Sequence, residues 1–330
     1  MVDSTQLERL NLIKARALVE KRFPNQDFHS EAKNSAAFIT SKDHTFVYAH
    51  NENVSALAIA LTIPELGSSW NLILNEPDHR VRTQIAGLQS DCSLWVVNGD
   101  TLAPHPHASP EEPQDYSIDH QMRILLENNH CVVIFEHGKV KGELKGLAIA
   151  EVATAPHGES FLEVGVGTYD QEAHKIVNYN EPVETTLERI SLEVLKYRHK
   201  DSVVHPLNRV SRPNWLIHEA RSPNSDLGLT DIERVPSPLE PTDVTQSLPA
   251  SAIAKKNDQS ILLTAYVGAD LEAVPATAQL LTSFPAEEIW FLHPPNDGHS
   301  AIRRQAEHLK IPASFIPVPE PWPTTPFTNC

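Results

Sequence analysis

The chain has 330 residues, 40% of them hydrophobic, and a formal net charge of −16 with histidine counted as neutral. This length suits two or three domains with substantial cores. The negative charge argues against unspecific binding to nucleic acid, which requires clustered lysine and arginine side chains. The sequence contains no run of about eighteen apolar residues, so it predicts no membrane span.

The three cysteines, Cys92, Cys131 and Cys330, are far apart and form no CxxC pair. This spacing excludes a zinc site built from cysteine pairs. Cys92 and Cys131 lie in apolar runs, so we expect small buried side chains in a reducing compartment. Together with a charged N-terminus that differs from a signal peptide, this predicts a soluble, cytoplasmic protein.

Residues 1–100 predict an N-terminal α/β unit. Apolar residues at helical spacing predict a helix over Asp3–Arg22, followed by short strands over Asp27–Glu31 and Ala36–Thr40. Strands and helices then alternate in the order Phe46–His50 (strand), Val54–Ile63 (helix), Trp70–Leu74 (strand), Asp78–Leu88 (helix) and Ser93–Val97 (strand). Such alternation predicts a parallel sheet with right-handed crossovers.

Residues 261–330 predict a C-terminal α/β unit with the same order of elements. These are Ile261–Val267 (strand), Leu271–Leu281 (helix), Ile289–Leu292 (strand), His299–Leu309 (helix) and Ala313–Val318 (strand). In both units a polar, proline-bearing turn follows the central strand and leads into an arginine-bearing helix. The predicted fold class is therefore α/β, with two βαβαβ, Rossmann-like units that flank an α+β middle domain. We favour a true repeat of residues 45–98 over coincidence.

Two stretches separate these units from the middle domain. Residues 101–114 are rich in proline and predict a linker. Residues 221–260 contain serine, proline, aspartate and threonine throughout, with little apolar periodicity, and predict a longer linker. The middle domain then covers residues 115–220.

The middle domain has a different pattern from the flanking units. Helices are expected over Ile118–Glu127 and Pro182–Arg198, and strands over Cys131–Glu136, Leu144–Val152 and Phe161–Gly167. Short turns join the three strands, which predicts an antiparallel meander. This domain is also where the candidate functional residues gather.

The stretch FLEVGVGTYDQEAH, Phe161–His174, is the first candidate site. Alternation along a strand places Glu163 on one face with two glycines that leave space in front of its carboxylate. Asp170 and His174 lie four residues apart on an expected helix, Tyr169–Val177, so they share a side of it. These three residues are the catalytic candidates, and the alternative is an exposed glutamate beside a solvated Asp–His pair.

The stretch HPLNRVSRPNW is the second candidate site, with His205, Asn208, Arg209 and Arg212 as ligand-binding candidates. Guanidinium groups pair bidentately with oxyanions, so this group predicts a small anionic ligand or an acidic protein partner. The alternative is that these side chains cap and brace helix ends.

The order helix–strand–strand–strand–helix, with Leu162-Glu163-Val164-Gly165 on the third strand, is similar to the core of the PD-(D/E)xK nucleases. That resemblance implies a metal site in which Glu163 and an earlier acid, Glu143 or Glu151, hold Mg²⁺. Gly165 stands where that family has its lysine. The two candidate stretches also resemble those of uncharacterised actinobacterial proteins, which implies a cytoplasmic protein and no assigned function.

The sequence thus leaves two classes of function open. The first is binding of a small anionic ligand or a protein partner, without nucleic acid or membrane and without an identified cofactor. The second is a metal-dependent hydrolase or nuclease that uses Mg²⁺ at Glu143 and Glu163. The sequence sets neither the ligand nor the oligomeric state.

Overall fold

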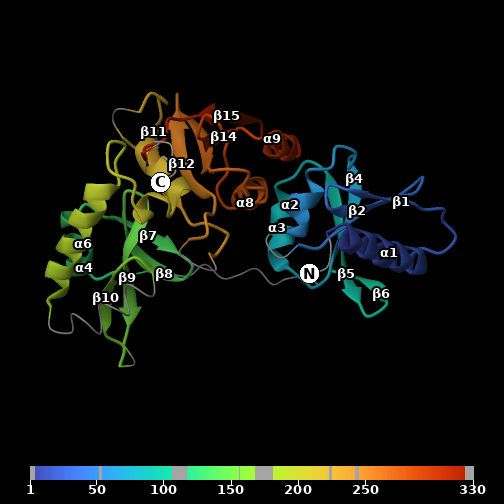
Figure 1. The fold of residues 1–330 in the computed structure, drawn as a ribbon, viewed down its shortest axis with the longest axis horizontal. Coiled ribbons are helices and arrows are strands. Elements are labelled where there is room, and N and C mark those ends of the chain that lie inside the picture. The colour runs from blue at the N-terminus through green and yellow to red at the C-terminus, as the bar shows by residue number, and fades with distance from the viewer. Residues whose placement is uncertain are drawn as a thin grey trace, which may run out of the picture. The chain divides into compact units, whose positions relative to one another are not determined.

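The computed structural model describes residues 4–51, 54–105, 117–155, 157–167, 181–222, 225–241 and 245–323. The chain divides into two compact units (Figure 1). The first comprises Met1–Glu111, Gly268–Glu288 and Gly298–Ala313, and the second comprises Glu112–Val267, Ile289–Asp297 and Ser314–Cys330. The predicted C-terminal unit, residues 261–330, is therefore divided between the two compact units. Its residues 268–288 and 298–313 belong to the first unit, and its other residues belong to the second.

The N-terminal sheet has six strands in sequential order. They are β1 (His29–Lys33), β2 (Ala36–Thr40), β3 (Thr45–Ala49), β4 (Ser69–Leu74), β5 (Asp91–Asn98) and β6 (Thr101–Pro104). Only β3–β4 and β4–β5 pair in parallel, and the other neighbours are antiparallel. The start of the predicted linker 101–114 is thus a strand, because residues from Thr101 to Pro104 continue the sheet by a hairpin with β5.

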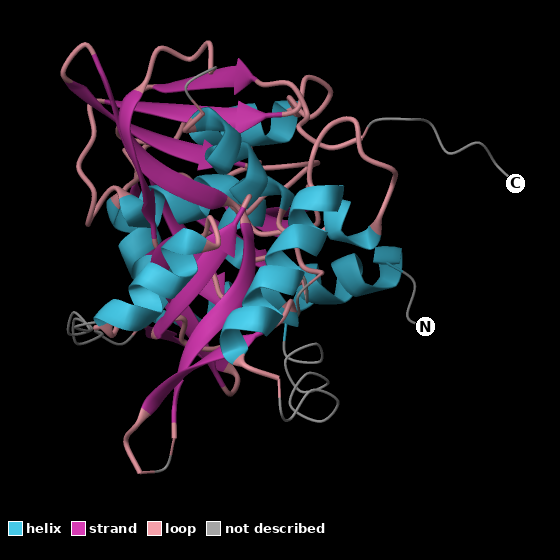
Figure 2. Cartoon of the chain, turned by 90° about the vertical axis from the view of Figure 1, so that its left-hand side faces the viewer, coloured by secondary structure: helices cyan, strands magenta, loops and turns pink. Residues whose placement is uncertain are grey.

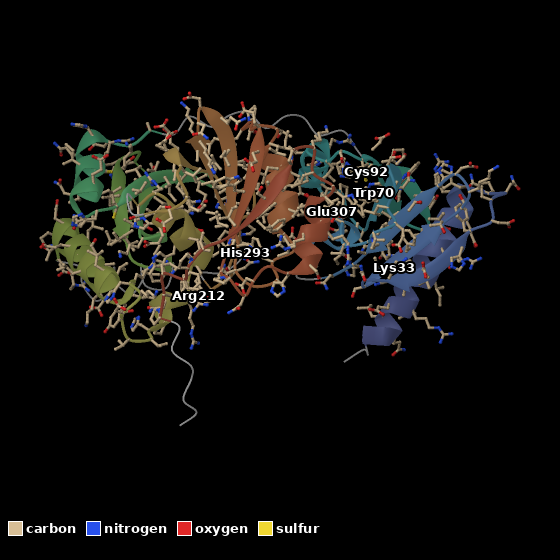
Figure 3. All side chains as sticks on the ribbon, turned by 90° about the horizontal axis from the view of Figure 1, so that it is seen from above. Lys33, Trp70, Cys92, Arg212, His293 and Glu307 are labelled. Atoms are coloured by element: carbon tan, nitrogen blue, oxygen red, sulfur yellow. The ribbon has the colours of Figure 1, made fainter. Side chains whose placement is uncertain are left out.

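Helices cover both faces of this sheet. Helix α1 (Ser4–Arg22) packs over β1, β2, β3 and β6, whereas α2 (Ala56–Ala60) packs on β3 and β4 and α3 (His79–Ala86) on β5. The core under α1 combines Ala15, Leu18 and Val19 of the helix with alternate residues of the strands, such as Phe46 and Tyr48. On the opposite face Trp70 is 1% exposed and lies beside Cys92 of the next strand (Figure 3).

Helices α8 (Ala273–Leu280) and α9 (Ser300–Ala306) complete the first unit by packing on its other helices. Helix α3 approaches α8 so closely that a Cβ on Gly87 would lie 2.1 Å from the Ala278 carbonyl oxygen. Glycine is therefore required there. Leu88 and Leu309 form an antiparallel bridge just after α3 and α9.

The middle sheet has four antiparallel strands in the order β10-β9-β8-β7. Their bounds are β7 (Val132–Glu136), β8 (Lys139–Leu144), β9 (Leu147–Thr154) and β10 (Ser160–Val164). The three-strand meander predicted from the sequence is wrong by one strand. Lys145 and Gly146, both at positive φ, turn the chain inside the predicted strand 144–152, and the polar β8 precedes that turn.

Helices α4 (His120–Asn128) and α6 (Val183–Tyr197) cover one face of the middle sheet (Figure 2). Leu126, Leu187, Ile190 and Val194 of these helices pack with apolar residues of the strands such as Leu162. The helices expected over 118–127 and 182–198 are thus confirmed. The predicted helix 169–177 lies outside the described residues.

A third sheet has the order β11-β12-β13-β14-β15. Its strands are β11 (Thr230–Val235), β12 (Ala250–Lys256), β13 (Gln259–Ala265), β14 (Glu288–His293) and β15 (Ala313–Pro317). A short 3-10 helix η1 (Pro206–Asn208) precedes α7 (Arg212–Ala220), which packs on β12 and β13. The long linker predicted over 221–260 is wrong, because β11 and β12 lie in it and join the sheet through antiparallel ladders, with an irregularity in β11 between Thr230 and Glu233.

The predicted α/β fold class is confirmed by these mixed sheets and helices. The finer description of both units as Rossmann-like is not confirmed. Cys131 is buried as expected, whereas Cys92 is only partly buried and Cys330 lies outside the described residues. Among the described residues, no helix is long and apolar enough to cross a bilayer.

Candidate functional site

The face of the middle sheet that the helices leave open borders a cavity of about 570 Å³. Its floor is formed by residues of β7, β8, β9 and the end of β10, among them Lys141, Glu151 and Glu163. Ser211 and Asn214 at the start of α7 form one wall. Residues within 237–241 and 246–249, in the stretch predicted as a linker, form another. All of these residues belong to the second unit.

The floor carries charged side chains in one row across three strands. Glu163 of β10 stands directly opposite Glu151 of β9, and Glu151 stands opposite Lys141 of β8. Lys139 Nζ lies 2.6 Å from Glu151 Oε1. The row thus places two carboxylates side by side on β9 and β10. Like charges directly opposite each other in a sheet repel, which is unfavourable.

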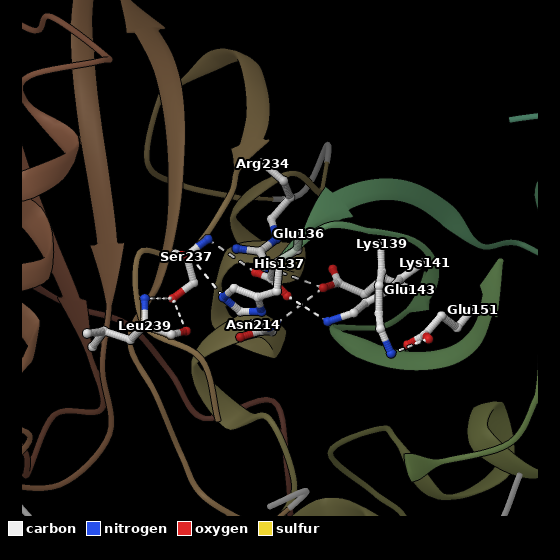
Figure 4. Close-up of polar contacts among 10 residues, drawn as sticks. All are labelled: Glu136, His137, Lys139, Lys141, Glu143, Glu151, Asn214, Arg234, Ser237 and Leu239. Carbon is white, nitrogen blue, oxygen red and sulfur yellow. Dashed lines mark hydrogen bonds and ion pairs between the residues drawn. The ribbon is translucent and has the colours of Figure 1, made fainter. Parts of the chain in front are cut away.

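A buried ion network lies beside this row and connects β7 and β8 with β11 (Figure 4). Arg234 Nη2 of β11 lies 3.4 Å from Glu143 Oε2 and 3.8 Å from Glu136 Oε1, and its side chain is only 6% exposed. Asn214 Nδ2 donates a second hydrogen bond to Glu143 Oε2, at 3.3 Å. Removing one partner of such a buried pair leaves an uncompensated charge, which typically costs about 3–5 kcal/mol. The network therefore fixes β7 and β8 to β11 and α7.

The charge state of Glu136 follows from the same network. Burial by itself would raise its pKa, but Arg234, Lys141 and His137 together with the Ser237 backbone N–H bring the pKa below its ordinary value. Lys141 Nζ lies 3.3 Å from Glu136 Oε2. Glu136 is thus ionised at neutral pH and holds the cations on its side of the cavity.

The wall after β11 is held by short-range and long-range hydrogen bonds. The Ser237 N–H donates to Glu136 Oε1 at 3.2 Å, and His137 Nε2–H donates to the Ser237 carbonyl at 3.0 Å. The Ser237 hydroxyl donates to the Leu239 carbonyl and accepts from the Leu239 N–H. The turn between β7 and β8 therefore positions a loop that is a hundred residues away in the sequence (Figure 4).

Glu143 approaches Asn214 because two backbone segments meet without side chains between them. A Cβ on Gly146, which follows β8, would lie 2.3 Å from the Trp215 nitrogen, and Gly146 has φ +76°. Only glycine allows the turn after β8 to lie against the start of α7.

The structure brings together three of the acids that the sequence singled out. Glu143, Glu151 and Glu163 all line the cavity, and Glu163 is on the face opposite the buried Leu162 and Val164, as predicted. Asp170 and His174 lie outside the described residues. Whether they join Glu163 stays a prediction.

The second predicted site, from His205 to Arg212, is an ordered segment at η1 and the start of α7. His205 Nδ1 accepts from the Leu207 N–H at 3.3 Å, and its ring stacks on Tyr197 with centroids 3.9 Å apart. Asn208 is 2% exposed, and its carbonyl accepts from Arg212 Nε at 2.8 Å. These contacts show bracing, whereas binding at this segment stays a prediction.

Sequence reasoning missed Arg198, the residue that holds this segment in place. Its guanidinium is fully buried and donates to the carbonyls of Lys145, Leu207 and Val210 at 3.1, 2.6 and 2.9 Å. It also stacks over Trp215, 4.2 Å from the ring centroid. Burial lowers its pKa, with an opposing contribution from Glu143. The only signal in the sequence was a basic residue at the end of a predicted helix.

Sequence reasoning also missed Asn214, Arg234 and Lys141. Arg234 lay in a predicted linker and Lys141 between two predicted strands, so neither was placed opposite an acid. The pairs of Glu143 with Asn214 and Arg234 span 71 and 91 residues along the chain. No local pattern reports contacts over such separations.

The metal site expected at Glu143 and Glu163 has limited support from the geometry. Among the residues described, no group of three or more His, Cys, Asp and Glu side chains could hold a metal ion. Glu143 already accepts hydrogen bonds from an amide and a guanidinium, and a cation would have to displace them. The residues present do not fit a three-ligand magnesium centre.

No family model, no curated protein and no solved structure matches this chain. The site must therefore be interpreted from its own geometry.

Proposed function

We propose that this protein binds a small polar ligand with a positively charged group in the cavity of the middle sheet. The observation that carries the proposal is the pair of carboxylates, Glu163 and Glu151, facing each other across two strands on the cavity floor. Lys139 already pairs with Glu151, and an ammonium or guanidinium group of a ligand would add charge-assisted hydrogen bonds to these carboxylates and relieve their repulsion.

The balance of charge supports a cationic group over the anion expected from the sequence. Among the residues that the structure describes, five glutamates line the cavity, namely Glu136, Glu143, Glu151, Glu163 and Glu240, against two lysines, Lys139 and Lys141. Even with Arg234 behind Glu143, the carboxylates outnumber the cations. An anionic ligand would have to enter against this excess.

The pairing of the protein's own cations with carboxylates also supports a positively charged ligand. Lys141 pairs with Glu136, Arg234 pairs with Glu143, and Lys139 pairs with Glu151. Asn214, Ser211 and Ser237 add hydrogen-bonding groups, while Ile134, Leu239 and Leu248 provide apolar surface. Pockets that combine apolar walls with a few placed polar groups are typical of small-molecule sites.

Thermal unfolding with L-arginine or putrescine as the probe tests the proposal. Binding to the native state must raise the unfolding midpoint of the wild type by mass action. We expect that rise to be lost in Glu163→Gln. Glu188→Gln is the matched control, because Glu188 is exposed on α6, which covers the other face of the sheet. Equal midpoint shifts in wild type and Glu163→Gln would contradict the proposal.

The same measurement decides the metal-dependent alternative. If Mg²⁺ raises the wild-type midpoint and Glu163→Gln abolishes that rise, the hydrolase or nuclease hypothesis replaces this proposal. If neither amine nor Mg²⁺ shifts the midpoint, both hypotheses for the cavity are wrong.

We propose separately that Arg209 contacts an anionic ligand or partner, as the sequence suggested. Arg209 is exposed, and with burial its charge lowers the pKa of the neighbouring Arg212, while Asp297 and Glu320 act in the opposite direction. Arg212 stacks over Trp322, 4.7 Å from the ring centroid. Reduced affinity for inorganic phosphate in Arg209→Gln would support this role, and unchanged affinity would contradict it.

We also propose that the two βαβαβ stretches are copies of one unit. In each, two antiparallel strand pairs precede the alternating elements, as β1-β2-β3 and β11-β12-β13. Thr62 and Thr282, after the first helix of each copy, both donate to the carbonyl three residues earlier at 2.7 Å. A buried glutamine lies four residues before each leucine of the Leu88–Leu309 bridge.

The contacts around that bridge have the reciprocity of a two-fold axis. The Gln89 N–H donates to the His308 carbonyl at 2.9 Å, and the Lys310 N–H donates to the Gly87 carbonyl at 3.0 Å. Equivalent positions thus meet each other, as in a symmetric dimer. A double-mutant cycle of Leu88→Ala and Leu309→Ala should show coupling of about 0.5–3 kcal/mol, and strict additivity would contradict the direct contact.

A further inference from the structure

We propose that Lys14, Asn75 and His50 form a second site, in the first unit, that binds a small oxyanion such as phosphate or a carboxylate. The residues come from helix α1 and from the carboxyl ends of the neighbouring parallel strands β3 and β4. Ligands of α/β proteins commonly bind outside the carboxyl ends of such strands. This site is independent of the cavity on the middle sheet.

A continuous chain of hydrogen bonds connects these residues. Lys14 Nζ donates to Tyr48 Oη at 3.0 Å and to Asn75 Oδ1 at 2.9 Å. The Tyr48 hydroxyl donates to Asn75 Oδ1 at 2.8 Å, and Asn75 Nδ2 lies 2.8 Å from His50 Nδ1. All four distances are within the range of good hydrogen bonds, so the cluster has one preferred geometry.

The chemistry of the partners fixes every proton in this chain. An ammonium group can only donate, so the atom of Asn75 that faces Lys14 is its oxygen and the atom that faces His50 is its nitrogen. The amide nitrogen donates, and His50 Nδ1 therefore accepts. The proton of the neutral imidazole is then on Nε2, where it can donate away from the cluster.

The groups that the chain leaves for a ligand are all donors. The third N–H of the Lys14 ammonium, the second N–H of the Asn75 amide and the His50 Nε2–H are not used by any described residue. The cluster presents no unused acceptor except through the lone pairs of Tyr48 Oη, and it carries the positive charge of Lys14. Donors around one cation are the arrangement that binds oxyanions.

The surroundings keep the cluster both rigid and accessible. The Tyr48 side chain is 1% exposed in the core under α1, and Lys14 Nζ lies 5.1 Å from its ring centroid. Lys14 and His50 are exposed residues. Glu76 follows Asn75 and is exposed, and Asp78 farther along is engaged as the cap of α3 and with Arg80.

The corresponding end of β13 and β14 in the third sheet has a different chemistry. Tyr266 after β13, His293 at the end of β14 and Phe315 of β15 pack as aromatic rings, with His293 2% exposed. His293 Nδ1–H donates to the Pro294 carbonyl at 2.7 Å. The exposed donors are therefore a property of the first copy and not of the fold.

Titration of the full chain with inorganic phosphate and with acetate, at constant ionic strength, tests the site. We expect the wild type to bind at least one of them and Lys14→Gln to bind it at least about tenfold more weakly, since a hydrogen bond to a charged group is worth about that factor or more. Lys21→Gln is the matched control, because Lys21 is on the same helix and pairs with Asp100 instead.

A second variant separates binding from bracing. His50→Phe removes the outward donor and one exposed hydrogen bond to Asn75 but leaves the contacts among Lys14, Tyr48 and Asn75, so it should weaken binding and change the unfolding midpoint in the absence of anion only slightly. Binding of phosphate alone would indicate a phosphate site, and binding of acetate as well would indicate a site that also accepts carboxylates. No binding of either anion to the wild type, or equal binding to wild type, Lys14→Gln and His50→Phe, would overturn the proposal. Glu163→Gln should leave this titration unchanged, so failure here is distinct from failure of the cavity proposal.

Discussion

The N-terminal sheet and the middle sheet differ in how many of their faces are covered. Helix α1 covers one face of the N-terminal sheet and helices α2 and α3 cover the other, so consecutive residues of β3 such as Phe46, Val47 and Tyr48 are all buried. In the middle sheet α4 and α6 cover one face, and consecutive residues of β10 alternate between buried and partly exposed.

This difference shows where each sheet can bind a ligand. A sheet buried on both faces offers only the ends of its strands, which is where Lys14, Asn75 and His50 lie. A sheet with an open face can present a row of side chains, and the middle sheet uses it for Glu163, Glu151 and Lys141. The substitutions below test whether covered positions support stability and open positions support binding.

The largest effect is expected for Trp70→Ala in the N-terminal sheet. The indole is 1% exposed and donates to Ser90 Oγ at 3.0 Å, so its removal leaves a cavity and an unpaired hydroxyl. We expect a loss of about 3–5 kcal/mol in the free energy of unfolding, measured by urea denaturation. A loss below about 1 kcal/mol would show that this face is less tightly packed than described.

Leu162→Ala tests the covered face of the middle sheet. Leu162 is 9% exposed and packs in the core with α4 and α6. We expect a loss of about 2–5 kcal/mol in the free energy of unfolding, and unchanged ligand affinity per native molecule. A change in affinity larger than the change in stability would mean that the two faces are not independent.

Asp270→Asn tests a buried carboxyl of the first unit. Burial, together with the charge of Glu272, raises the pKa of Asp270 to about 7. The contribution of this group to stability is thus fully present below its ordinary pKa and is lost as the pH rises through about 7. Asparagine cannot ionise, so we expect Asp270→Asn to gain on the order of 1–3 kcal/mol relative to wild type between low and neutral pH. Parallel stability–pH curves would contradict this.

Glu136→Gln should show the opposite dependence in the second unit. The pKa of Glu136 is lowered, so its stabilising contribution is present above the ordinary pKa of a glutamate and is lost as the pH falls through the lowered value. We expect the wild type to lose stability on acidification more steeply than Glu136→Gln. Measuring Asp270→Asn, Glu136→Gln and the wild type over the same pH range compares the two units directly. If the difference in unfolding free energy between wild type and variant changed with pH in the same direction for both variants, the comparison would be refuted.

The smallest effect on stability is expected for Glu163→Gln, the neighbour of Leu162 on the opposite face. Glutamine keeps the shape of the side chain on a partly exposed strand position, so the free energy of unfolding should change by less than about 0.5 kcal/mol. Circular dichroism and urea denaturation check this. A large loss would mean that Glu163 supports the fold, and its loss of binding would then say little about the cavity.

The sequence was sufficient for the elements with strong local patterns. Alternating strands and amphipathic helices placed α1, α6 and the two βαβαβ stretches to within a few residues. Strand β12 was missed because its inward residues are Ala250, Ala252 and Ala254, which give little apolar signal. Strand β8 was missed because its sequence, KVKGEL, places charges on the open face of the sheet.

The candidate site was predictable in part for a similar reason. Glu163 could be placed on an open face from alternation alone, whereas Glu143 and Glu151 were candidates only through the resemblance to the nuclease core. Arg234, Asn214 and the wall after Ser237 could not be found, because each is brought to the cavity by pairing between strands far apart in the chain.

Isothermal titration of the wild type and of Glu163→Gln with L-arginine tests the central claim most directly. The account predicts measurable binding to the wild type and to Glu188→Gln, and binding at least about tenfold weaker to Glu163→Gln, because a charge-assisted hydrogen bond is lost. Equal affinity in all three proteins, or binding only of inorganic phosphate at a site that depends on Glu163, would contradict it.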